Sequence, residues 1–305
     1  MLKALTKYCS IYPLNIHYGT TIGRSMKSFG SNLTSFYLTR FQIPGYPSMS
    51  DNPNLKIAIS GTYSTGKSTT TEALSIATGI PRTHAKTSRQ LLVDLVPGKT
   101  VMELNAMELV KLGLRRFEER VHNESRTTAF ISDGGVFHEW VYFEARMRVG
   151  INPGAKWWFR TVKKIMGLPV KHFYQRYTDT LGGITRDRAK RIYDAYVHLP
   201  VEFDMEADGH RPVSEEFRRL SDDLLIEALD RMDIPYRVVG GPIPDRIEKI
   251  IELFGLPVVV PIPDAIAEAE RRVKADLDDL KEDARFHEAQ RKKSLIRQIS
   301  YAFRY

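Results

Sequence analysis

Short and long apolar segments alternate along residues 54–258 of the chain. The short ones are rich in β-branched and aromatic residues and predict strands at 57–60, 80–83, 127–132, 195–199 and 236–239. The longer ones carry apolar residues three or four positions apart and predict helices at 67–77, 88–92, 101–123, 136–147, 214–232 and 244–254. Parallel strands need long crossovers, which helices usually supply. The alternation therefore predicts an α/β domain with a five-stranded, mostly parallel sheet covered on both faces.

The helix over 101–123 has the clearest pattern. Glu and Arg occupy one side, and apolar residues form the other: Met102, Leu104, Met107, Leu109, Leu112, Leu114 and Phe117.

Residues 146–191 differ from their surroundings, with twelve Lys or Arg and only two acidic residues. We interpret them as a helical insertion with turns at 153–154, 167–169 and 182–183. Its aromatic residues are Trp157, Trp158, Phe159, Phe173, Tyr174 and Tyr177. Together with the basic residues they could stack on and bind a nucleic acid. They also suit the hydrophobic underside of a helical cap, which is the interpretation that we favour.

Both ends of the chain lie outside this pattern. In residues 263–305, apolar residues from Ile266 to Ala284 recur at three- and four-residue spacing, which predicts a long amphipathic helix. It would serve as a strap against the core or as a coiled-coil contact, and in the second case as the interface of a homodimer. The basic stretch 291–297 would suit a membrane surface or a partner, but a solvated face is the simpler interpretation.

Residues 1–50 contain five basic side chains, no acidic ones and no clear periodicity. They would form either an organelle-targeting presequence or a disordered, dispensable extension. Met49 precedes the first predicted strand by only a few residues, as expected of a native N-terminus. We therefore favour the dispensable extension.

The composition narrows the protein class. The net charge is +8, but residues 51–305 hold 40 basic and 37 acidic side chains, so no general polyanion-binding surface follows. No apolar run approaches the roughly 20 residues of a membrane-spanning helix. Cys9 is the single cysteine, and the histidines show no zinc-site spacing. These features predict a soluble cytoplasmic protein without a transmembrane segment.

The first predicted strand runs into the sequence pattern G-x-x-x-x-G-K-[ST]. The residues expected to surround a phosphate chain are Gly61, Thr62, Tyr63, Ser64, Thr65, Gly66, Lys67, Ser68 and Thr69. The glycines let successive backbone N–H groups point inward, and the next helix adds the positive end of its dipole. Lys67 would reach the terminal phosphates and the Ser68 hydroxyl would bind Mg²⁺. The strand–loop–helix context predicts a site for ATP and Mg²⁺.

Asp133 ends the third predicted strand, at the edge where parallel sheets present residues to a ligand. A carboxylate there could hold Mg²⁺ or accept a proton from an attacking hydroxyl. A plain Asp-Gly-Gly turn is the alternative. We predict the functional role, with Lys67 and Asp133 as catalytic residues.

Together, the 61–68 motif, Asp133 with the following His138-Glu139-Trp140, and Asp208-Gly209-His210-Arg211 resemble the P-loop nucleoside-kinase group. The most similar type is the ribosylnicotinamide-kinase-like, AAA-type ATP-binding domain, and the resemblance covers about residues 56–255. It implies a three-layer P-loop kinase-like fold and a mobile lid that brings catalytic Arg211 over the triphosphate. Loop 240–242 would lie near the adenine.

The resemblance also implies an acceptor site. We expect Arg89, Glu139 and Trp140 to bind the substrate. The chain departs from the group's acid-x-x-Arg pattern, because Lys86 stands where the acid is expected.

Two functions follow from these features. The first is a kinase that transfers phosphate from MgATP to a hydroxyl of a nucleoside-like or other small molecule. The alternative is an ATPase or nucleotide-dependent switch that engages a macromolecular partner. A GTPase is disfavoured, since the chain has no N-K-x-D signature.

Overall fold

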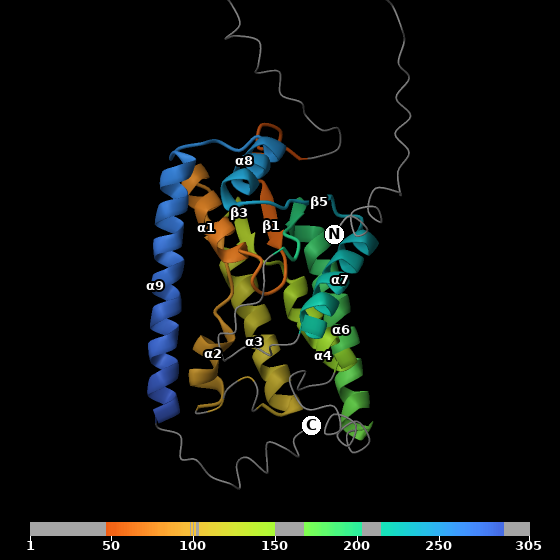
Figure 1. The fold of residues 1–305 in the computed structure, drawn as a ribbon. Coiled ribbons are helices and arrows are strands. Elements are labelled where there is room, and N and C mark those ends of the chain that lie inside the picture. The colour runs from red at the N-terminus through yellow and green to blue at the C-terminus, as the bar shows by residue number, and fades with distance from the viewer. Residues whose placement is uncertain are drawn as a thin grey trace, which may run out of the picture. The chain divides into compact units, whose positions relative to one another are not determined.

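The computed structural model describes residues 47–97, 99, 101, 104–149, 168–202 and 215–289. Among these, five strands form one sheet in the order β2-β3-β1-β4-β5, and every neighbouring pair is parallel. The strands are β1 (Lys56–Ser60), β2 (Arg82–Thr83), β3 (Phe130–Asp133), β4 (Ala195–His198) and β5 (Tyr236–Val238). The predicted α/β sheet is confirmed. Because all strands run the same way, their carboxyl ends share one edge (Figure 1).

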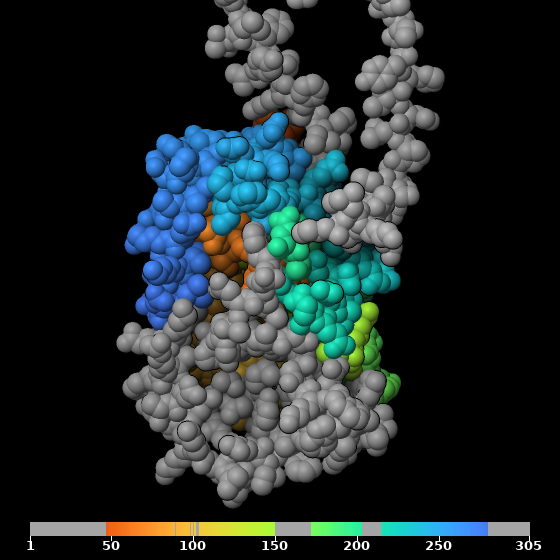
Figure 2. Space-filling model, viewed as in Figure 1, coloured from red at the N-terminus to blue at the C-terminus, as the bar shows by residue number. Residues whose placement is uncertain are grey.

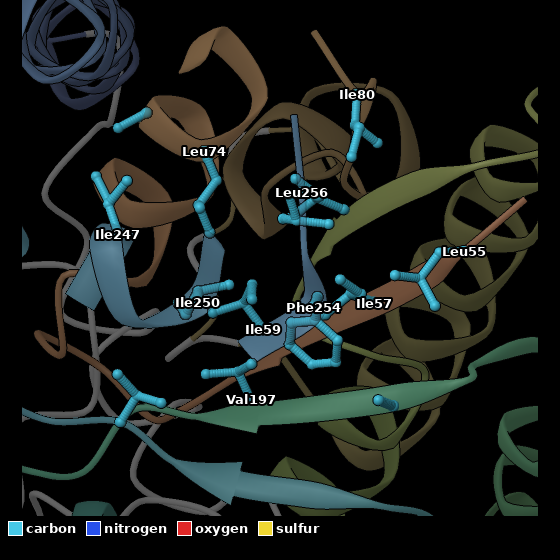
Figure 3. Packing of buried hydrophobic residues seen from close by; sticks show 14 of the residues in the cluster. Leu55, Ile57, Ile59, Leu74, Ile80, Val197, Ile247, Ile250, Phe254 and Leu256 are labelled. Atoms are coloured by element: carbon cyan, nitrogen blue, oxygen red, sulfur yellow. The ribbon is translucent and has the colours of Figure 1, made fainter. Parts of the chain in front are cut away.

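Helices cover both faces of the sheet (Figure 1). They are α1 (Lys67–Thr78), α2 (Ser88–Leu95), α3 (Ala106–Glu124), α4 (Phe137–Val149), α6 (Leu168–Ile192), α7 (Glu215–Met232), α8 (Ile243–Phe254) and α9 (Ile262–Ala289). Ile57 and Ile59 of β1 pack with α1 and α8, as Figure 3 shows, whereas Ala58 packs with α4 and α7. This alternation is the two-residue period of a strand buried on both faces, and it produces three layers.

The third helix starts later than its pattern predicted. Asn105 is the N-cap of α3, and the capping box that it forms with Glu108 satisfies two backbone N–H groups. The predicted start at residue 101 is therefore wrong. Met107 and Leu114, from the predicted apolar side, are 60% and 49% exposed, whereas Arg120 of the polar side is only 3% exposed. Met107 and Leu114 therefore lie outside the buried side of α3, whereas Arg120 is part of it.

Helix α6 runs through the turn expected at 182–183, so that prediction is wrong. It also begins at Leu168, inside the turn expected at 167–169. A Cβ atom on Gly182 would lie 2.7 Å from Nε1 of Trp140 in α4, whereas one on Gly183 would meet nothing within 4 Å. The first glycine therefore lets α6 approach the indole ring.

Two aromatic residues of the insertion are part of a core. Tyr174 and Tyr177 of α6 pack against Phe143 of α4, with ring centroids 5.6 and 5.4 Å apart. For these two residues the helical-cap interpretation is confirmed, but it is wrong for Phe173, which is 47% exposed. Trp157, Trp158 and Phe159 lie outside the described residues.

The C-terminal helix packs as a strap. Ala265 and Ala269 are fully buried, and α9 runs beside α1 (Figures 1 and 2). This side of α9 is covered by its own chain, so a homodimer would need another part of the helix. The basic stretch 291–297 lies outside the described residues.

The end of the expected N-terminal extension also contacts the core. The Met49 N–H donates to the Phe254 carbonyl at 2.8 Å, and its side chain packs on the sheet cluster. Ser48 is buried. We therefore propose that the dispensable part ends before residue 47. No helix among the described residues has the length and apolarity needed to cross a membrane.

The two glycines of α6 provide a matched test of its packing. Gly182→Ala should lower the free energy of unfolding by about 1–2 kcal/mol, because the new methyl group overpacks against Trp140. Gly183→Ala should raise it by about 0.5–1 kcal/mol, because alanine favours an open helical position. Urea unfolding of both variants measures the difference. Equal effects at both positions would contradict the observed packing.

Candidate functional site

The loop between β1 and α1 has the backbone conformation that its glycines permit. Gly61 and Gly66 have φ angles of 148° and 76°. A Cβ atom on Gly61 would also lie 2.9 Å from the Leu199 carbonyl oxygen, beyond the end of β4. Glycine is therefore required at Gly61 both by conformation and by close backbone approach. We call residues 61–68 the phosphate loop.

Two buried arginines hold the outer side of the phosphate loop. Arg218 Nε, on α7, donates to the Tyr63 carbonyl at 3.0 Å. Arg246 Nη1, on α8, donates to the Thr65 carbonyl at 2.6 Å, and its Nε donates to the Gly241 carbonyl at 2.6 Å. These bonds fix the loop carbonyls pointing outward. With its carbonyls bound on the outside, the phosphate loop can turn its N–H groups towards the inside. This is the arrangement that binds an anion.

A buried histidine holds the beginning of the loop. His138 Nδ1 accepts from the Gly135 N–H at 3.1 Å, so Nε2 carries the proton and donates to the Gly61 carbonyl at 3.0 Å. Burial, together with the positive charges of Lys67 and Arg120, lowers the pKa of His138 to about 3. His138 is therefore neutral near pH 7, and it acts as a positioning residue rather than as an acid or base.

The N-terminus of α1 completes the anion site. Gly66 is its N-cap, and no side chain hydrogen-bonds there. The first-turn N–H groups of Lys67, Ser68 and Thr69 therefore have no side-chain cap at the end that carries the positive helix dipole. The structure thus places the predicted cofactor-binding residues 61–69 in one turn of loop and helix.

The side chains of Lys67 and Asp133 meet at this point. Lys67 Nζ lies 3.3 Å from Asp133 Oδ1, and Arg82 Nη2 lies 2.5 Å from Asp133 Oδ2. Burial alone would raise the pKa of Asp133. The two cations outweigh it and hold the pKa well below its ordinary value. Asp133 is therefore a firmly ionised carboxylate, better suited to holding cations than to accepting a proton.

The donor set around Asp133 fits Mg²⁺. Ser68 lies close enough to Asp133 to help lower the pKa of its carboxylate, so the two expected ligands are adjacent. Mg²⁺ keeps several waters and needs only one or two protein oxygens beside the phosphates. The described residues contain no group of three or more His, Cys, Asp or Glu side chains that could hold a metal without such help.

Glu139 lies behind the site, in contact with two arginines. Its carboxylate accepts from Arg116 Nε at 2.7 Å and lies 3.4 Å from Arg120 Nη2. Burial raises the pKa of Glu139, but the arginines outweigh it, so the pKa is lowered. Arg120 Nη1 in turn donates to the Asp133 and Gly134 carbonyls at 3.2 and 2.8 Å. Both Glu139 oxygens are thus engaged by protein, and a substrate role would operate through the partly exposed Arg116.

The other predicted substrate residues are spread out. Trp140 packs against α6, with the guanidinium carbon of Arg186 5.9 Å from its ring centre. Arg89 lies in the first turn of α2, and its side chain is outside the described part of the structure. The lid residue Arg211 and the stretch 208–211 are also outside the described residues. The substrate roles of Arg89, Glu139 and Trp140 remain predictions.

The site is shaped by arginines that the sequence pattern did not indicate: Arg82, Arg116, Arg120, Arg218 and Arg246. One of them could have been found, because Arg82 lies in the second predicted strand, at the same sheet edge as Asp133. The others are helical residues, and a helical pattern alone assigns arginine to the solvated side.

Comparisons with known families and with solved structures found matches. A family model described as an AAA domain matches residues 56–246. Deoxyadenosine kinase from M. mycoides with bound dATP aligns with a TM-score of 0.45 and 16% identity over 65% of this chain and 97% of that chain. NadR protein in complex with NR aligns with a TM-score of 0.45 and 14% identity over 68% of this chain and 53% of that chain. No curated protein matches.

The neutral His138 predicts a pH dependence of stability. Its folded pKa of about 3 is below the ordinary 6.5, so the unfolded chain takes up this proton first as the pH falls. The contribution of neutral His138 to the free energy of unfolding is complete above about pH 6.5. It is lost as the pH falls towards 3, by up to about 1.4 kcal/mol per pH unit. Urea unfolding between pH 7 and pH 4 should give a shallower profile for His138→Gln than for the parent. Parallel profiles would contradict a buried neutral imidazole.

Proposed function

We propose that this chain, which belongs to the AAA domain family, is a P-loop phosphotransferase. It would transfer the terminal phosphoryl group of MgATP to a hydroxyl of a nucleoside-like or other small molecule. The observation that carries the proposal is the pairing of Lys67 with Asp133 at 3.3 Å, beside a phosphate loop held open from outside.

Each part of the site would have its own role in phosphoryl transfer. The inward N–H groups of the phosphate loop and the start of α1 would bind the β- and γ-phosphates. Lys67 would leave Asp133 for the terminal phosphate, where its charge opposes the charge that develops during transfer. Bound Mg²⁺, near Ser68 and Asp133, would neutralise phosphate charge. Phosphoryl transfer depends mainly on positioning and charge stabilisation, so the weak basicity of Asp133 is compatible with it.

The acceptor would lie on the Glu139 side of Asp133. Arg116 is a partly exposed cation there, and Glu139 and the Lys86 carbonyl fix its orientation. A guanidinium held by a buried carboxylate can donate to hydroxyl or carbonyl groups of a small molecule in a defined direction. Arg89 and Trp140 would complete this side. Mass-spectrometric screening of metabolite pools for ATP-dependent phosphorylation would identify the acceptor.

The alternative is an ATPase or switch with a macromolecular partner. Its support is the direct ion-pair connection between the C-terminal helix α9 and α1, through Arg272 and Glu72 at 3.0 Å. A partner on α9, or a homodimer through its exposed part, could use this connection.

Substitution of Lys67 tests the nucleotide site. Lys67→Ala should weaken ATP binding by about tenfold to a hundredfold, the loss of a charge-assisted contact worth about 1.5–3 kcal/mol. Lys86→Ala is the matched control, because Lys86 is exposed and pairs with Glu119 outside the loop. Calorimetric titration with MgATP and circular dichroism measure affinity and fold. If Lys67→Ala binds MgATP as tightly as the parent, the phosphate-loop assignment is wrong.

Arg211 distinguishes the two functions. In a kinase, a lid arginine meets charge that develops during transfer, so Arg211→Ala should lower kcat at least a hundredfold with little change in ATP affinity. Arg211→Lys should recover only part, because an ammonium cannot reproduce the planar fork. In a switch, the same change would instead abolish the difference between ATP and ADP affinity.

Single-turnover transfer and titrations with ATP and ADP measure both quantities. Arg219→Ala, at an exposed position on α7, is the control. If neither turnover nor nucleotide discrimination changes in Arg211→Ala, the assignment of Arg211 to a lid is wrong.

A further inference from the structure

A line of alternating charges connects the C-terminal helix with the phosphate loop. Arg272 Nη1 on α9 lies 3.0 Å from Glu72 Oε1, and Glu72 Oε2 lies 2.9 Å from Arg82 Nη1. Arg82 Nη2 lies 2.5 Å from Asp133 Oδ2, and Asp133 Oδ1 lies 3.3 Å from Lys67 Nζ. We call these five residues the ion-pair chain. It joins α9, α1, β2 and β3.

The ion-pair chain runs from solvent into the protein. The side-chain exposure is 52% for Arg272, 13% for Glu72, 14% for Arg82, 9% for Asp133 and 18% for Lys67. Charges at the inner end are therefore weakly screened by water and salt, while the outer pair is screened. A change of charge at Glu72 or Arg82 should act strongly on Asp133, and a change at Arg272 weakly.

Arg82 is shared by two carboxylates, and Asp133 is shared by two cations. The more strongly Glu72 attracts Arg82, the more Asp133 depends on Lys67 for charge compensation. In the absence of Mg²⁺, nucleotide binding would draw Lys67 away to the phosphates, so Arg82 would remain as the cation on a buried carboxylate. Leaving such a carboxylate unpaired is costly. The strength of the ion pair between Arg82 and Asp133 should therefore determine how easily Lys67 is released.

We propose that Arg82 is a positioning residue that releases Lys67 for phosphate binding. Glu72 and Arg272 adjust the strength of the Arg82–Asp133 ion pair according to how α9 packs on α1. This rests on the proposed function only in that ATP binds at the phosphate loop. Helix α1 carries both Lys67 and Glu72, and α9 packs along it, so a displacement of α9 would be transmitted through two contacts. A partner that lifts α9 would lower nucleotide affinity.

The ion-pair chain predicts effects of opposite sign. Arg82→Gln leaves Lys67 as the only cation on Asp133 and should weaken ATP binding about tenfold. Glu72→Gln frees Arg82 for Asp133 and should strengthen ATP binding about twofold to threefold. Arg272→Gln leaves Glu72 uncompensated, draws Arg82 away and should weaken binding about twofold, the scale of an exposed pair.

The experiment is calorimetric titration of the full-length chain with ATP at low salt, with and without Mg²⁺ and without any acceptor. Arg271→Gln is the matched control: Arg271 is adjacent to Arg272 and also pairs with Glu268, but it has no contact with Glu72. It should leave the affinity unchanged. If Arg271→Gln weakens binding as much as Arg272→Gln, a general loss of positive charge explains the effect and the proposal is overturned.

The double variant Arg82→Gln with Arg272→Gln decides whether the residues act as one unit. In the ion-pair chain, the second change should have no further effect once Arg82 is lost, so the double variant should bind ATP like Arg82→Gln alone. Fully additive effects would overturn the proposal. A merely structural role for Arg82 would lower the melting temperature and leave the affinity of the folded protein unaltered, which would also overturn it.

Failure of this inference is separable from failure of the proposed function. If Lys67→Ala removes ATP binding while Arg82→Gln and Glu72→Gln have no effect, the nucleotide site stands and the ion-pair chain is only structural. If the parent chain does not bind ATP, both proposals fail. Because binding is measured without acceptor, the outcome does not depend on kinase activity.

Discussion

The phosphate loop can present N–H groups inward only because its carbonyls are held from outside. His138 holds Gly61, Arg218 holds Tyr63, and Arg246 holds Thr65. A tight loop without these donors would leave buried backbone oxygens unpaired, at a cost of about 1–3 kcal/mol each. The holding residues come from α4, α7 and α8, so the packing of helices on both faces of the sheet converges on one loop. Arg218 and Arg246 are buried for this reason.

Behind the loop, buried charges occur in compensated groups. Glu139 lies between Arg116 and Arg120, and Asp133 lies between Lys67 and Arg82. An isolated buried charge is expensive, whereas paired and hydrogen-bonded charges specify orientation. Arg120 connects the two groups through the strand-end carbonyls of Asp133 and Gly134. The proposed nucleotide and acceptor sides of the site are therefore parts of one electrostatic unit, in which moving one cation changes the balance of the others.

In this view a kinase and a switch share the same machinery. In both, Lys67 would move from the Asp133 carboxylate to a phosphate. In both, Arg82 and Glu72 would connect this movement to α9. They would differ in whether the proposed lid residue Arg211 acts on the transferred phosphate, and in whether α9 has a partner. We propose a small-molecule kinase as the function that the residue set supports best, because Lys67 pairs with Asp133 at 3.3 Å beside the phosphate loop.

The sequence by itself determined the sheet and the chemical centre. Strand patterns repeat every two residues, and the carboxyl ends of parallel strands meet at one edge, so the α/β fold and the meeting of Lys67 and Ser68 with Asp133 followed from local pattern. The tertiary structure decided which polar residues are buried. Arg120, Arg218 and Arg246 lie on helices whose pattern assigns arginine to solvent, and only the neighbouring carbonyls and carboxylates compensate their burial. It also placed Gly182 inside a continuous α6, where the indole of Trp140 occupies the space of a side chain, and no local signal encodes a contact between residues 42 positions apart.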